Sequence, residues 1–93
     1  MLYNNLYLIK VDNIRRIVVL DENNEIRVGA TEGLREENEA TITKIVWLSS
    51  KEALKAYSSM VVYLTKVTDI WRLLIEGFFY IRGESRYTST FEH

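Results

Sequence analysis

The acidic residues are the group in this 93-residue chain with the most obvious potential for chemistry. In the stretch DENNE, Asp21, Asn23 and Glu25 alternate in the way that the oxygen ligands of a calcium loop do. However, Ile26 stands where such a loop needs glycine, and no bidentate glutamate follows at the required distance. We therefore expect a solvated turn here, with no metal ion bound.

The sequence offers few residues that could carry out nucleophilic catalysis. Cysteine is absent, and the only histidine, His93, is the last residue. A serine or cysteine nucleophile needs a neighbouring base that activates it. Gly29 and Gly33 are not followed by the lysine and hydroxyl residue of a phosphate-binding loop. The prediction is a protein that is not an enzyme, with no catalytic residue and no cofactor.

The composition indicates a folded protein with a single domain, residues 1–93. It is 47% hydrophobic and 27% charged, with a net charge of -1. Charged residues interrupt the most apolar segment before it reaches the roughly 20 residues that span a bilayer. No secretion signal is visible at the start, and the lack of cysteine fits a reducing compartment. The expectation is a cytoplasmic protein without a membrane partner; the residue bias also suits a small viral or archaeal protein.

The elements that would position side chains begin with short segments rich in β-branched and aromatic residues. Residues 6–11 and 17–20 predict strands, and the alternation in residues 25–30 predicts a half-exposed third strand. Asn23 and Asn24 tolerate the left-handed conformation of a tight turn, so residues 17–30 are expected to form a β-hairpin. Residues 41–48 predict a further strand, with a helix over 34–47 as the alternative.

The segment that follows predicts one long helix, over about residues 50–76. Ser49 and Glu52 have the spacing of a capping box, and Gly77 suits the position after a helix end. Apolar residues then recur four and three positions apart, at Ala53, Tyr57, Met60, Leu64, Val67, Trp71 and Leu74. With further apolar residues on both flanks, the apolar arc is about twice the ~100° stripe of a helix that lies on a core.

One face of a sheet cannot cover such an arc, so the second flank predicts a homodimer. The expected fold class is α+β: an antiparallel sheet with the long helix packed on it and a C-terminal β-hairpin that rejoins the sheet. The expected function is a non-enzymatic protein–protein interaction module that acts as a homodimer through this helix and also offers a surface to a protein partner. The candidates for the interface are Tyr57, Met60, Leu64, Val67 and Trp71.

The C-terminal hairpin is predicted from Gly83 and Glu84, a Gly-X pair between two strand-like segments that is typical of a type II′ turn. Arg82 and Arg86 flank this turn and are expected to be near neighbours across it, with Tyr87 beside them. These residues could form a binding surface. The alternative is a solvated hairpin without a binding role, whose like charges favour solubility.

The stretch DIWRLLIEGFFYIRGESRYTSTF, residues 69–91, resembles the end of a winged helix-turn-helix domain, where a recognition helix precedes a two-stranded wing with a basic tip. The resemblance implies an alternative fold, a winged helix-turn-helix with an N-terminal β-hairpin. The implied function is a small DNA-binding regulator with nucleic acid as partner. It implies an exposed face at Lys66, Asp69 and Arg72 and a core at Ile70, Leu73 and Leu74. The implied nucleic-acid contacts are Lys66, Arg72, Arg82 and Arg86. The two folds differ at Ser58 and Ser59, where the long helix would continue and a helix-turn-helix would break.

Overall fold

An antiparallel sheet forms the centre of the protein. The computed structural model describes residues 7–48 and 56–91. Its strands are β1 (Tyr7–Arg15), β2 (Ile42–Trp47), β3 (Tyr57–Leu64), β4 (Phe78–Ile81) and β5 (Glu84–Thr90). Its helices are α1 (Arg16–Val19), α2 (Ala30–Asn38) and α3 (Val67–Glu76). The five strands lie in the order β2-β3-β1-β5-β4, and all neighbours are antiparallel. The predicted α+β class with an antiparallel sheet is confirmed.

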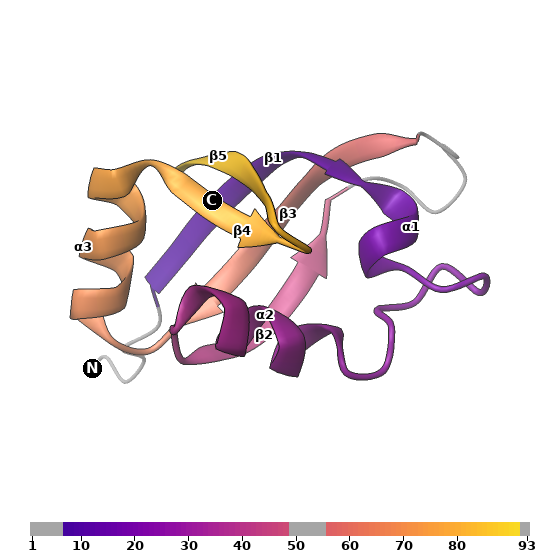
Figure 1. Cartoon of the computed structure of the whole chain (residues 1–93), viewed down its shortest axis with the longest axis horizontal. Coiled ribbons are helices and arrows are strands. Elements are labelled where there is room, and N and C mark those ends of the chain that lie inside the picture. The colour runs from indigo at the N-terminus through magenta and orange to yellow at the C-terminus, as the bar shows by residue number, and fades with distance from the viewer. Residues whose placement is uncertain (1–6, 49–55, 92–93) are drawn as a thin grey trace.

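The sheet is curled, so that the β4–β5 hairpin crosses over the strands β1, β3 and β2 (Figure 1). Helix α2 contacts both edge strands, β2 and β4, and so closes the gap between them. Helices α3 and α1 lie at opposite ends of the molecule (Figure 1). Apolar side chains from the sheet and from α3 fill the inside of the curl; the largest fully buried ones are Phe79, Ile9, Ile14, Ile42, Met60, Leu64 and Leu73.

A β-bulge bends β1 where the sheet curls. Val11 lies opposite Met60 and Ile14 lies opposite Ser58, so β1 contains one residue more than β3 over this span. The extra residue is accommodated at Asn13, whose φ of 62° is left-handed. Because the bulge shifts the alternation by one residue, Ile14 points to the same interior as Val11. The strand therefore stays in the core as it turns towards α1.

The outer edge of β4 is bound by side chains from the end of α2. Asn38 is buried, its Oδ1 accepts the Tyr80 N–H at 2.7 Å, and its Nδ2 donates to the Tyr80 carbonyl at 2.8 Å. The Glu37 carboxylate accepts the N–H groups of Arg82 and Gly83, at 2.8 and 2.5 Å. A strand edge normally presents such groups unpaired. Here Glu37 and Asn38 of α2 bind the backbone groups that a further strand would otherwise pair with.

The predicted long helix is wrong. Residues 57–64 form β3, which pairs with β1 on one side and β2 on the other, and the helix is only α3. Half of the residues of β3 are β-branched or aromatic, and such residues favour strands. Because residues 60–64 are hydrophobic at every position, apolar residues also recur at helical spacing without a helix. Gly77 does end α3, with φ 80°. The predicted capping box lies outside the described residues.

The predicted hairpin over residues 17–30 is also wrong, because α1 replaces the first strand and the second is reduced to a single bridge between Leu20 and Ile26. The C-terminal hairpin turns at Arg82 and Gly83, with φ of 52° and 82°. Two consecutive positive φ values are typical of a type I′ turn, one residue earlier than the predicted type II′ turn. None of the helices in the described ranges has the length and hydropathy of a membrane-crossing segment.

Replacing Asn38 by alanine should lower the free energy of unfolding by about 2 kcal/mol, because Tyr80 would lose partners for both its N–H and its carbonyl. Urea unfolding measures the change. Glu36→Ala, an exposed position on the same helix, is the matched control and should change stability by less than about 0.5 kcal/mol. Equal effects of the two substitutions would contradict the role given to Asn38.

Candidate functional site

The outer face of α3 carries an exposed apolar row. Val67, Trp71 and Ile75 follow one another at intervals of four residues, so they lie along one face of the helix. Their exposed fractions are 45%, 60% and 76%. Leu73 packs in the core on the opposite side, with Ile70 and Leu74 partly buried against it. The row contains no charged residue, and it includes two of the five predicted interface residues.

The other predicted interface residues lie elsewhere. Met60 and Leu64 are fully buried in the core from β3, so they are not available to a partner and their prediction as interface residues is wrong. Tyr57 is exposed, but it is the first residue of β3 and pairs with Arg15, at the other end of that strand from α3. The structure therefore brings Val67 and Trp71 together and separates both from Tyr57.

Asp69 and Arg72 connect α3 to the end of α2. Asp69 is buried, and its carboxylate accepts the Thr41 N–H at 3.0 Å. Arg72 donates to the carbonyls of Asn38 and Glu39 at 2.9 Å each, and its guanidinium lies 3.7 Å from the Asp69 carboxylate. Carbonyls at a helix C-terminus lack partners within the helix, so a cation there is favourable. The exposed face that the winged-helix resemblance implies for these two residues is therefore not present.

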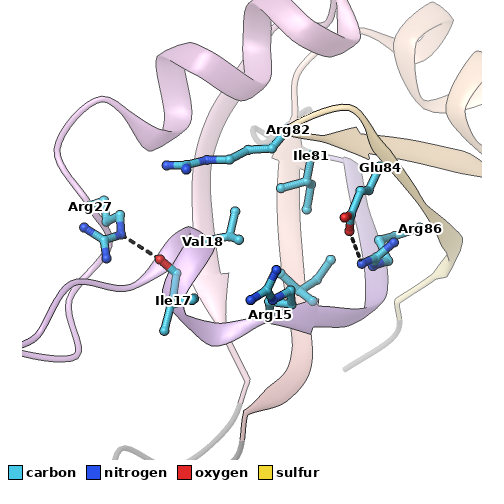
Figure 2. Close-up of a pocket in the computed structure, with 9 residues that line it drawn as sticks. Arg15, Ile17, Val18, Arg27, Ile81, Arg82, Glu84 and Arg86 are labelled. Atoms are coloured by element: carbon cyan, nitrogen blue, oxygen red, sulfur yellow. Dashed lines mark hydrogen bonds and ion pairs between the residues drawn. The ribbon is translucent and has the colours of Figure 1, made fainter.

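Arg82 and Arg86, in contrast, line a pocket at the open end of the curled sheet (Figure 2). The pocket has a volume of about 420 Å³ and lies between the tip of the β4–β5 hairpin, the end of β1 and α1. Four arginines and one glutamate surround an apolar floor; the lining residues are Ile14, Arg15, Ile17, Val18, Arg27, Ile81, Arg82, Glu84 and Arg86. Neither Lys66 nor Arg72 takes part in it.

The arginines of the pocket are held in different ways. Arg86 donates to the carbonyls of Asn13 and Ser85 at 2.8 Å each and pairs with the Glu84 carboxylate at 2.5 Å. Among the described residues, the guanidinium groups of Arg15 and Arg82 have no hydrogen-bond or ion-pair partner. Arg86 is thus held in place and largely neutralised, whereas the positive charges of Arg15 and Arg82 are not paired with an acid of the pocket.

Arg27 reaches the pocket from the loop between α1 and α2. Its Nε donates to the Ile17 carbonyl at 2.8 Å, a bond that does not use its two terminal amino groups (Figure 2). The loop is closed by Asp21, whose carboxylate accepts the N–H groups of Asn23 and Glu25 at 2.8 and 3.0 Å. The pKa of Asp21 lies below its ordinary value of 3.8, chiefly because the N–H of Glu25 donates to its carboxylate. The acid predicted as a solvated turn residue therefore shapes the loop that carries Arg27.

Arg15 and Arg27 are pocket residues that the sequence did not identify. The signal for Arg15 was weak, because the bulge at Asn13 decides on which side of β1 it emerges. For Arg27, the expected strand over residues 25–30 concealed the loop that carries it. Of the four arginines of the pocket, the sequence predicted only Arg82 and Arg86 as near neighbours, because they lie on either side of a recognisable turn.

Comparison with models of known protein families, with curated protein sequences and with solved structures finds no match to this chain. Within the described ranges, no group of three or more histidine, cysteine, aspartate or glutamate side chains is arranged to hold a metal ion. The two features of the surface that stand out are the apolar row on α3 and the pocket with four arginines.

Arg72→Ala should lower the free energy of unfolding by about 1–2 kcal/mol, because it removes two hydrogen bonds from a charged donor to helix-terminal carbonyls. Lys66→Ala is the matched control: it removes an exposed cation next to the start of the same helix and should be nearly neutral. Urea unfolding of both variants checks the difference. A neutral Arg72→Ala would show that the contact with α2 does not stabilise the fold.

Proposed function

We propose that the protein is a non-enzymatic interaction module that forms a symmetric dimer through the outer face of α3. The observation that carries the proposal is Trp71, which is 60% exposed in the middle of the apolar row. A tryptophan supplies one of the largest apolar areas of any side chain, and such residues are enriched at the energetic centres of interfaces. This exposed row supports the dimer that was predicted from the sequence, although the long helix on which that prediction was based is not present.

The spacing of the row favours a second copy of the chain as the partner. Val67 and Ile75 lie four residues before and four residues after Trp71. When two such helices pack antiparallel about a two-fold axis, Trp71 meets its own counterpart and Val67 meets Ile75 of the other copy. A two-fold interface requires one patch that is complementary to itself. This row satisfies that requirement with three side chains.

Neighbouring aromatic residues support an apolar interface of larger area. Phe78 follows α3 after a single glycine, and its ring lies 5.7 Å from that of Tyr87 across the hairpin. Both side chains are exposed, as is Tyr80 on the same face of β4. Stable interfaces bury about 800 Å² on each partner, with aromatic residues at the centre. The row and this aromatic pair together would provide a core for such an area.

Trp71→Glu should shift the protein to monomer, raising the dissociation constant at least tenfold, or ~1.4 kcal/mol, because it places a carboxylate at the two-fold axis. Sedimentation velocity at micromolar concentration measures the shift. Tyr57→Glu is the matched control, since it makes the same change at an exposed aromatic residue remote from α3. A wild-type protein that stays monomeric, or a dimer that Tyr57→Glu disrupts equally, would contradict the proposal.

A further inference from the structure

The pocket at the open end of the sheet concentrates positive charge in a protein that has none in excess. The whole chain has a net charge of -1, yet four arginines and a single glutamate line this one hollow. Glu84 pairs with Arg86, so Arg15, Arg27 and Arg82 have no acid of the pocket to neutralise them. Like charges around one cavity repel each other unless an anion lies between them. The arrangement therefore points to an anionic occupant.

The number and type of cations favour a phosphate group over a carboxylate. Guanidinium groups match the oxygens of either anion with pairs of parallel hydrogen bonds. A single carboxylate can be neutralised by one such group, as Glu84 is through the contact of its Oε1 with Arg86. A phosphate monoester carries up to two charges and three terminal oxygens. Those oxygens can accept from Arg15, Arg27 and Arg82, which approach the pocket from three different segments of the chain (Figure 2).

The floor of the pocket indicates that the ligand also has an apolar part. Ile14 and Ile81 are buried in the core beneath it, and Val18 is partly buried beside them. The apolar lining residues that a bare phosphate ion would leave in contact with water are Ile17, which is 60% exposed, and the partly buried Val18. The volume of about 420 Å³ falls in the range of small-molecule sites and exceeds what one phosphate needs.

We propose that this pocket binds a small phosphate monoester, with its phosphate group between Arg15, Arg27 and Arg82 and its apolar body against Ile17 and Val18. Arg86 acts as a positioning residue. Its bond to the Asn13 carbonyl joins the hairpin to the bulge of β1 beside the pocket. The site is independent of the dimer interface, because α3 lies at the other end of the molecule (Figure 1).

Isothermal titration calorimetry with phenyl phosphate, inorganic phosphate and phenol tests the site. Phenyl phosphate should bind saturably and about tenfold more tightly than inorganic phosphate, because its ring covers apolar floor. Phenol should not bind, because it lacks the anion. Absence of saturable binding by phenyl phosphate, or equal binding of phenol, would overturn the proposal.

Three variants assign the binding to the pocket. Arg82→Gln and Arg15→Gln should each weaken phenyl phosphate at least about tenfold, because each removes charged hydrogen bonds. Arg35→Gln makes the same change of charge at an exposed position of α2 outside the pocket and should leave the affinity unchanged. Two independent pocket variants keep the test valid if one of them unfolds. An equal loss in Arg35→Gln would show non-specific attraction and overturn the assignment.

Two further arms separate this site from other surfaces. Trp71→Glu should bind phenyl phosphate as the wild type does, so the dimer and the pocket can fail independently. A short DNA duplex titrated in the same buffer should bind more weakly than phenyl phosphate, since the net charge of the chain is negative. A duplex that binds more tightly and depends on Arg15 and Arg82 would replace the small ligand by nucleic acid.

Discussion

The pairing of Asn38 with the backbone of Tyr80 is the interaction on which the rest of this structure depends. It joins the end of α2 to the outer edge of β4, and Glu37 continues the junction to the turn at Arg82 and Gly83. Since α2 also contacts β2 at the far edge of the sheet, these bonds hold the two edges close together. In this way α2 covers the gap between the two edges of a sheet that has five strands in the described part of the chain.

Both features of the surface follow from this closure. Asn38 and Glu37 of α2 bind the hairpin where it crosses the sheet, and its position brings Arg82 and Arg86 opposite the end of β1 and the loop with Arg27. At the other end of the molecule, Asp69 and Arg72 of α3 form hydrogen bonds with the backbone at the end of α2 and in the segment that leads to β2. These two polar residues of α3 are thus bound within the molecule, whereas the apolar row with Trp71 is exposed beside Thr68 and Glu76.

The sequence predicted the class of fold better than the elements or the pocket. The antiparallel sheet, the end of α3 at Gly77 and a strand within residues 41–48 were correct because local patterns determine them. Residues 57–64 were misread because Met60, Val61 and Val62 are buried in succession, on both faces of β3, and a continuous apolar run has no period that separates strand from helix. The pocket depends on contacts between distant segments, such as Arg86 with Asn13, which no local pattern encodes.

The closure of the sheet is tested most directly by amide hydrogen exchange at Tyr80. In an isolated hairpin this N–H would face away from β5 into solvent and would exchange rapidly. If Asn38 accepts it as described, the Tyr80 amide should be protected to a degree similar to that of residues in the central strands β1 and β3. An exchange rate close to that of an unstructured chain, with those strands still protected, would contradict the account.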